Sequence, residues 1–341
     1  MAGTQGDGSS ERPRSVDSTT TTLAADDSVD HESLSDFHSL LSNTGSVKST
    51  IFNYQYENGR RYHAYRAGQY YLPNDEDEQD RLDLVHHVFR LTLGGGLCAT
   101  ELENPQRILD VGTGTGIWAI EMGDEFPESE IIGTDLSPIQ PPWAPPNVRF
   151  ETDDARQEWT FPPDFFDFIH VRCMGGSILN WPEFLERCYK HLKPGGKLEV
   201  SEARTNLWSG DGPLPQDSFT AKWLSEFNRI VNSLGLEFDI SPALPGFLDS
   251  LPFAQVKKMD KQVPITPWSE NKTLKEIGRV MEIVMLGSGL SAYTLALFTR
   301  NGWKVPDIEN LLDKVKEEFR EGGMNIGTYF SYVTATKPAV R

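Results

Sequence analysis

Short apolar runs alternate with amphipathic stretches through the middle of the chain. Buried strands are predicted for the apolar runs at 107–111, 130–134, 148–151, 166–171 and 197–201. Helical spacing is found at 117–126 and at 181–192, where the sequence KPGG at 193–196 ends the second helix. Strands that alternate with helices through short crossovers indicate an α/β fold with parallel strand order.

An acidic stretch before this region also has helical periodicity. Leu82, Val85 and Phe89 recur at helical spacing, and acidic side chains lie in the first turns, where the helix dipole favours them. Asn74 is predicted to cap this helix.

The pattern changes after residue 202. Helices are predicted at 218–234, 272–299 and 306–320, and strands at 255–259 and 328–336. An apolar segment that includes Leu244 and Phe253 is predicted to be a loop. These helices are longer than simple connections between strands need to be, so we expect them to cover a pocket.

The apolar stretch at 283–298 predicts a buried helix and no membrane span. It has 16 residues, interrupted by Gly287 and Gly289, whereas a span needs roughly 20 predominantly apolar residues. The N-terminus lacks the apolar core of a secretory leader. We therefore expect a soluble, cytoplasmic protein.

The two N-terminal segments differ in composition. Residues 1–50 are rich in Ser, Thr and Asp and contain few large apolar groups, which predicts a disordered acidic tail. Residues 51–73 are rich in aromatic side chains, mostly tyrosine, and this density implies burial.

The net charge indicates which classes of partner the chain would repel. With 32 Lys plus Arg and 50 Asp plus Glu, the formal charge is −18, so phosphate backbones and anionic lipid surfaces repel the chain. We expect neither nucleic acid nor a membrane as partner. Cys98, Cys173 and Cys188 are too few and too scattered for a disulfide framework or a thiolate metal cluster, so no metal is expected.

The densest chemical signal is the sequence ILDVGTGTGIWAI at 108–120. A predicted strand ends there, Gly112, Gly114 and Gly116 allow a tight turn, and a helix then begins with its N–H groups directed at the same crevice. A small ligand is expected in that crevice.

The spacing separates two classes of ligand. A dinucleotide site has the pattern G-x-G-x-x-G, whereas Ile117 stands where its third glycine would be. Asp110, just before the turn, would repel a pyrophosphate but attract the amino group of a methionine-like ligand. Asp135 ends the second strand, where a carboxylate can accept both ribose hydroxyls.

Together these motifs resemble the class I S-adenosylmethionine-dependent methyltransferases, in particular a fungal branch with LaeA-like proteins and many enzymes of secondary metabolism. The resemblance extends over residues 52–337 and includes LPNDEDEQDRLD at 72–83, DLSPIQP at 135–141, SILNWPEFLERCYKHLKPGGKLEVSE at 177–202 and YFSYVTATKP at 329–338. It implies a Rossmann-like α/β fold with a seven-stranded, mostly parallel sheet, an antiparallel last strand and helical lid insertions.

The resemblance implies S-adenosylmethionine as cofactor and gives its contacts by position. The methionine moiety would be held by Asp110, Gly112, Thr113, Gly114 and Gly116, the ribose by Asp135 with Leu136, and the adenine by Asp154 with Ala155; Asp153 competes with Asp154. Tyr65, Arg66 and Tyr71 would close over the cofactor, with ordinary core packing as the alternative for the tyrosines.

We expect five segments. They are the tail at 1–50, an aromatic and helical cover at 51–104, the cofactor-binding core at 105–205, helical lid insertions with strand six at 206–325, and the last strand with the C-terminus at 326–341.

Two residues are candidates for acid–base chemistry. His170, near the carboxyl end of a strand that faces the methyl donor in this fold, is the first candidate for a general base. Its alternative is a structural role, in which the backbone lines the cofactor and the ring makes a structural hydrogen bond. Glu202 is the second candidate, and its alternative is a carboxylate that orients a neighbouring loop. Methyl transfer needs positioning and exclusion of water more than a strong acid or base.

Large side chains after residue 202 predict a sizeable apolar or aromatic acceptor. The candidates are Trp208, Phe219, Trp223, Phe227, Phe247, Phe253, Trp268, Met281, Met285, Tyr293 and Phe298.

Three functions fit these features. The first is methylation of a small, largely apolar natural product of fungal secondary metabolism. The second is a pericyclase that uses the bound sulfonium electrostatically without methyl transfer. The third is a LaeA-like regulator in the nucleus, although no basic import cluster is present and the glycine motif reads GTGTG where GCGTG is expected. A homodimer through the aromatic segment is compatible with the sequence.

Overall fold

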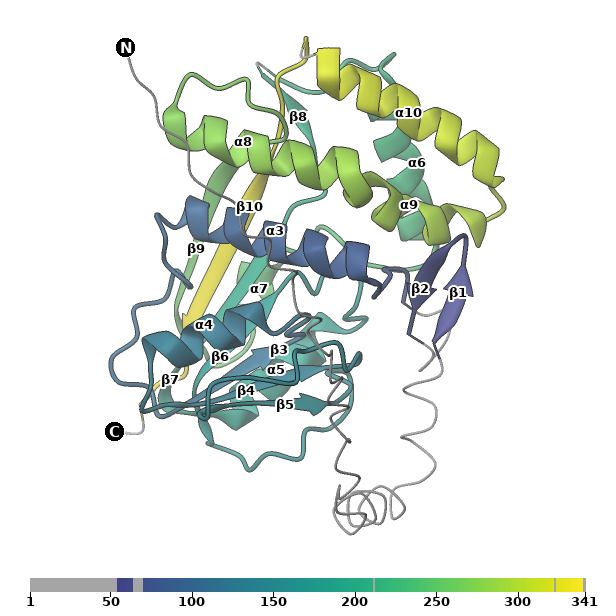
Figure 1. Cartoon of the computed structure of the whole chain (residues 1–341). Helices are drawn as coiled ribbons and strands as arrows, with labels where there is room; N and C mark the ends of the chain where they lie inside the picture. Colours follow the sequence, from purple (N-terminus) through teal and green to yellow (C-terminus); the bar gives the residue numbers. More distant parts are fainter. Residues whose placement is uncertain (1–53, 64–69, 211, 322, 340–341) are drawn as a thin grey trace, which may run out of the picture. The chain divides into compact units, whose positions relative to one another are not determined.

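The predicted strands pair into a single mixed sheet in the computed structural model of the chain (Figure 1), which describes residues 54–63, 70–210, 212–321 and 323–339. Five strands form its parallel part: β3 (Arg107–Val111), β4 (Glu130–Asp135), β5 (Val148–Thr152), β6 (Phe166–Arg172) and β7 (Leu192–Ala203). The predicted tail at 1–50, and with it the expectation of disorder, lies outside the described residues.

The antiparallel part of the sheet is formed around the last strand. β10 (Ile326–Thr336) runs antiparallel to β7 on one side and to β9 (Ala254–Pro264) on the other. The strand order is β5-β4-β3-β6-β7-β10-β8, with β9 also on β10. A mostly parallel sheet with an antiparallel last strand is thus confirmed, and the two-residue β8 (Trp208–Ser209) adds a short further pairing.

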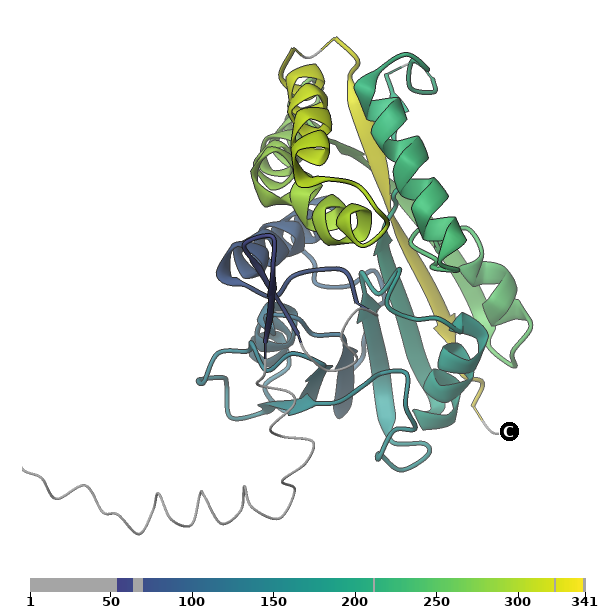
Figure 2. The same cartoon turned by 90° about the vertical axis from the view of Figure 1, so that its right-hand side faces the viewer.

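Helices cover both faces of the sheet. Those of the parallel part are α3 (Glu76–Thr92), α4 (Ile117–Glu125) and α5 (Trp181–His191), and those of the C-terminal part are α6 (Phe219–Ser233), α7 (Leu244–Asp249), α8 (Lys272–Val284), α9 (Leu290–Thr299) and α10 (Val305–Glu321). In Figure 2, α3 and α8 lie on one side of β10, and α6 and α7 lie on the other. The C-terminal helices α6, α8, α9 and α10 gather at one end of β10 (Figure 1).

The predicted cap of α3 is wrong. The side chain of Asp75 caps the helix, accepting the Glu78 N–H at 3.1 Å. The side-chain oxygen of Asn74 instead accepts a hydrogen bond from Arg61 Nε, and its Nδ2 donates one to Ser137 Oγ at 3.2 Å. Asn74 therefore holds the entrance of α3 against the hairpin of β1 (Gln55–Glu57) and β2 (Arg60–Tyr62) and against the loop after β4.

Two other predictions are corrected in the C-terminal part. The helix predicted at 272–299 is broken by a π-helical turn, Met285–Gly289, in which Gly287 has non-helical angles (φ −72°, ψ −110°). The Gly-Ser-Gly sequence there explains the kink, because such residues lower the cost of leaving helical geometry. The predicted apolar loop contains α7, whose Leu244 and Leu248 are buried.

The kinked helix belongs to the protein core. Lys272–Thr299 is long and apolar enough to cross a membrane by length and composition alone, but 56% of its most apolar window is buried inside the structure. Its buried residues pack with those of α3, α6 and β10 in one hydrophobic cluster. This agrees with the buried helix predicted from the sequence.

Candidate functional site

The glycine-rich loop connects β3 to α4 at the carboxyl edge of the sheet. Gly112, Gly114 and Gly116 all have positive φ (72°, 58° and 82°), which other residues adopt only with strain. A β-carbon at Gly116 would lie 2.5 Å from the Phe150 ring, and one at Gly112 would run into the Met174 sulfur. Glycine is needed here both for the turn and for the close approach of neighbouring groups.

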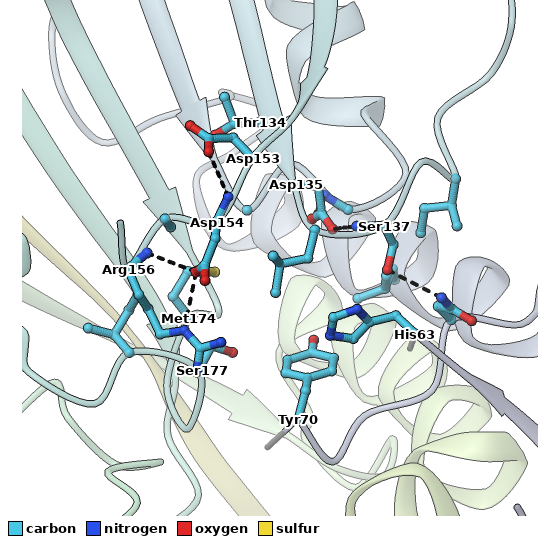
Figure 3. Close-up of a pocket in the computed structure, with 18 of the residues that line it drawn as sticks. His63, Tyr70, Thr134, Asp135, Ser137, Asp153, Asp154, Arg156, Met174 and Ser177 are labelled. Carbon is cyan, nitrogen blue, oxygen red and sulfur yellow. Dashed lines mark hydrogen bonds and ion pairs between the residues drawn. The ribbon is translucent and has the colours of Figure 1, made fainter. Parts of the chain in front are cut away.

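A cavity of about 790 Å³, including its open mouth, lies next to this loop (Figure 3). In the close-up it lies between Asp154, Arg156, Met174 and Ser177 on one side and His63, Tyr70 and Ser137 on the other. Of the predicted cofactor contacts, seven line this cavity: Gly112, Gly114, Asp135, Leu136, Asp153, Asp154 and Ala155.

Asp135 is held in the wall of this cavity by backbone groups. Its two carboxylate oxygens accept the Ser137 N–H at 2.8 Å and the Gly114 N–H at 2.9 Å. Burial raises the pKa of Asp135 to about 6, against the opposing effect of these two hydrogen bonds. The carboxylate is thus fixed in place, ionised above pH 6, and able to accept further hydroxyl donors from the cavity.

Asp153 and Asp154 lie side by side in the same wall. Asp153 Oδ1 accepts the Asp154 N–H at 2.8 Å, and Asp154 Oδ1 accepts both the backbone N–H and the Nε of Arg156, at 3.0 and 3.2 Å. Burial raises the pKa of Asp153. Both carboxyl groups line the cavity, so the two alternatives for the adenine contact remain as the sequence left them.

Asp110 and His170 form a buried pair behind the loop. His170 Nδ1 lies 2.8 Å from Asp110 Oδ1, and the other Asp110 oxygen accepts the Thr113 hydroxyl at 2.6 Å. The His170 ring stacks on Trp118 with centroids 3.7 Å apart. None of these side chains lines the cavity, so this placement favours the structural alternative for His170 over the general base.

Glu202 is likewise hydrogen-bonded within the fold, to the loop after β6. Its carboxyl group is buried and accepts the Met174 N–H at 2.8 Å and the Gly175 N–H at 3.2 Å. Burial raises the pKa of Glu202 to about 8. Glu202 lines neither this cavity nor the apolar one described below, and its contacts fit the alternative in which it orients the neighbouring loop.

The N-terminal cover contributes residues to the cavity wall that were not among the predicted cofactor contacts. Tyr65 and Arg66 lie outside the described residues, and Tyr71 lies beside Arg300, away from the cavity wall. The wall instead contains His63, Tyr70, Asn74, Glu78 and Leu82. Their signal in the sequence was their place in or near the block at 72–83 that resembles the family, because no local pattern tells which face of a loop meets a ligand.

A second cavity of about 780 Å³ adjoins the first. The two share Leu82, and the consecutive residues Cys173 and Met174 line one cavity each. Of the predicted acceptor residues, five line the second cavity: Trp223, Phe227, Met281, Met285 and Tyr293. The other six lie elsewhere in the structure: Trp208, Phe219, Phe247, Phe253, Trp268 and Phe298. We call the first, which is lined by four carboxyl groups, the polar cavity, and the second, which is lined mostly by aliphatic and aromatic residues, the apolar cavity.

Comparisons with known proteins show that the chain is similar to methyltransferases. Residues 84–237 match the family model described as a methyltransferase domain. The chain is 40% identical over 296 residues to a protein of Aspergillus terreus named methyltransferase pytC, covering 86% of this chain and 91% of that protein.

Two further relatives carry other names. The secondary metabolism regulator LAE1 of Cochliobolus heterostrophus is 37% identical, covering 76% of this chain and 86% of the relative. The protein-methionine methyltransferase laeA of Emericella nidulans is 32% identical, covering 77% and 71%. None of the three is named as a cyclase, so these relatives give no support to the cyclisation alternative.

Proposed function

Because the chain belongs to the S-adenosylmethionine-dependent methyltransferases, in the family that includes pytC and the LaeA regulators, we propose that it methylates a small, largely apolar natural product of fungal secondary metabolism. The observation that carries the proposal is the apolar cavity that meets the polar cavity at Leu82. An acceptor in the apolar cavity would lie next to a cofactor bound in the polar one.

The residues of the polar cavity fit S-adenosylmethionine. Gly112 and Gly114 bring the backbone of the loop after β3 to the cavity without a side chain, and Asp135 presents a fixed carboxylate to which two ribose hydroxyls could donate. Asp153, Asp154 and Ala155 also line this cavity, which supports an adenine contact by one of the two carboxyl groups. When bound, the cofactor supplies a methyl group on a sulfonium sulfur.

The protein's own part is to position the acceptor and to exclude water. A displacement at a methyl group requires the acceptor atom and the leaving group to be in line, and holding them so can supply most of the acceleration. Trp223, Phe227 and Tyr293 give the acceptor cavity a rigid aromatic wall that keeps water away. His170 and Glu202 line neither cavity, which supports a transfer that relies on positioning and uses neither of them as a base.

Incubation with methyl-labelled cofactor tests the proposal. Small apolar intermediates of the pathway encoded beside this protein should take up the label and gain the mass of one methylene group. Asp135→Asn should reduce transfer strongly, because the ribose loses its charged acceptor. Failure of every such intermediate, with a chain that still binds S-adenosylhomocysteine, would overturn the choice of acceptor. A product of unchanged mass would contradict methyl transfer.

A regulator that acts through protein partners is the second candidate, favoured by the identity of 37% to LAE1. It requires a nuclear location, whereas the methyltransferase of small molecules requires only the cytoplasm. Localisation of the tagged protein and co-purification decide between them. A nuclear protein with stable protein partners, and label transferred to a protein, would support the regulator.

A further inference from the structure

From here on we call the polar cavity the cofactor cavity and the apolar cavity the acceptor cavity, after the ligands proposed for them. An arginine of α3, Arg81, lies in the wall of the acceptor cavity. The side chain of Arg81 is only 4% exposed, and its Nε and Nη2 donate to Glu78 at 2.8 and 2.6 Å. Glu78 lines the cofactor cavity and Arg81 lines the acceptor cavity, so the ion pair spans the boundary between them.

One nitrogen of this guanidinium, Nη1, takes no part in the ion pair with Glu78. Nη1 of Arg81 makes no hydrogen bond with any of the residues that the structure describes, and it is not among the fully buried atoms, so it is accessible to a ligand. The planar group offers five N–H donors, and Glu78 occupies only the edge formed by Nε and Nη2. The Nη1 edge can therefore receive an oxygen from a ligand in the cavity.

A second donor lies beside it. The ring of Tyr293 is 5.3 Å from the Arg81 guanidinium carbon, and its hydroxyl makes no hydrogen bond within the described part of the chain. Burial raises the pKa of Tyr293 to about 12, so this hydroxyl stays neutral and able to donate at physiological pH.

Among the described residues, no carboxylate other than Glu78 forms a hydrogen bond with Arg81 or Tyr293, although Asp77 and Asp80 line an open surface pocket that Arg81 also borders. The other arginine of the cavity, Arg204, is paired with Asp239 through Nε and Nη2 at 3.0 and 2.9 Å, and its side chain is 20% exposed. Glu202, near Tyr293, is directed at the backbone N–H groups of Met174 and Gly175. The remaining wall is mostly aliphatic and aromatic, where a charge-assisted hydrogen bond is stronger than in water.

We propose that the acceptor is an apolar molecule with an acidic oxygen, of the carboxylate, enolate or phenolate class, received by Arg81 Nη1 and the Tyr293 hydroxyl. This inference rests on the proposed function and narrows its substrate class. The position of Arg81 beside Leu82 places that oxygen at the boundary with the cofactor cavity.

Two isosteric probes test this without any turnover. The full chain, saturated with S-adenosylhomocysteine, is titrated with naphthalene-2-carboxylate and with naphthalene-2-carboxamide while the heat of binding is recorded. We expect the carboxylate to bind about tenfold more tightly, since charge-assisted hydrogen bonds are roughly twice as strong as neutral ones. Prior titration with S-adenosylhomocysteine alone tests the cofactor site separately, so a failure there is distinguished from a failure of this inference.

Variants assign the preference to residues. Arg81→Met should abolish it, and Tyr293→Phe, which removes one oxygen and leaves the fold undisturbed, should reduce it several-fold. Because Arg81→Met leaves Glu78 unpaired, Glu78→Gln/Arg81→Met is measured beside it. Arg279→Gln, which removes an exposed arginine with the same i,i+3 pairing on α8, should change nothing. Equal affinity for both probes, no binding of either, or loss of the preference in Arg204→Gln alone would overturn the proposal.

Discussion

At the scale of single residues, the site depends on where carboxyl groups are fixed. Asp135 lines the polar cavity and accepts backbone N–H groups, so it can still receive a donor from a ligand. Asp110 and Glu202 line neither cavity, and their hydrogen-bond donors are other groups of the protein. Three acidic side chains near one sheet edge thus have different tasks, because the hydrogen-bond donors around each differ.

We expect Asp135 to make cofactor binding dependent on pH. Its pKa is raised to about 6, so the carboxylate is ionised at pH 7.5 and mostly protonated at pH 5. A protonated carboxyl group accepts hydroxyl donors less well, so affinity for S-adenosylhomocysteine should fall as the pH drops through 6. Calorimetric titrations at pH 7.5, 6 and 5 measure this. Asp135→Asn should bind weakly with little pH dependence; an equal pH dependence in that variant would assign the effect to another group.

Glu202 should reduce stability in alkaline solution. Its pKa lies near 8 in the folded chain against 4.5 as the ordinary value, so the stability that its protonated form contributes is present below pH 4.5 and lost as the pH rises to about 8. Glu202→Gln keeps an oxygen for the Met174 N–H without a charge. It should raise the melting temperature by a few degrees at pH 8.5 and by less at pH 5.5. Glu276→Gln on the surface of α8 is the control, and a pH-independent effect of Glu202→Gln would contradict this account.

At the scale of elements, α3 connects the two cavities. Its first turns supply Glu78 to the cofactor cavity and Arg81 to the acceptor cavity, with Leu82 in both. The helix is anchored where it begins, because Asp75 caps it and also forms a bidentate ion pair with Arg60 of β2 at 2.7 Å. The hairpin and the cap together set the position of α3.

Removing that anchor should destabilise the fold and loosen the site. Asp75→Ala loses the cap and the ion pair and should lower the free energy of unfolding by about 1–2 kcal/mol, with weaker binding of S-adenosylhomocysteine. Asp75→Asn keeps a capping oxygen and should lose less. Urea denaturation and calorimetry of both variants check this; an equal loss in the two would show that the cap contributes nothing.

At the scale of the whole molecule, two cavities are enclosed between a sheet edge and helices that come from distant parts of the chain. The acceptor cavity alone takes residues from α3, α6, α8, α9 and β10. Its shape therefore exists only when the chain is folded, and ligands that bind there or in the cofactor cavity stabilise the fold by mass action.

Cofactor binding should be visible in thermal unfolding. S-adenosylhomocysteine at 100 times its Kd should add roughly 2.7 kcal/mol to the free energy of unfolding. For a chain of this size that corresponds to a rise of about 4 °C in melting temperature. Scanning fluorimetry with and without the ligand measures it. Asp135→Asn at the same ligand concentration should show a much smaller rise, and an unchanged melting temperature of the parent chain would contradict cofactor binding.

Local patterns in the chain were enough to predict the parallel strands, the glycine turn and the position of Asp135. Apolar runs, positive φ at glycine and the end of a strand are all set by neighbours in the chain. The cap of α3 was missed by one residue, since Asn74 and Asp75 are both good caps and only the contact of Asn74 with Ser137 separates them.

Only the tertiary structure decided which side chains face the cavities. His170 has a suitable place in the sequence, yet its ring packs on Trp118 and its Nδ1 lies 2.8 Å from Asp110 Oδ1. Only five of eleven candidate acceptor residues line the apolar cavity, and Arg81 does so without any sequence signal. The physical reason is that a wall built from several distant elements depends on their packing, which no local pattern encodes.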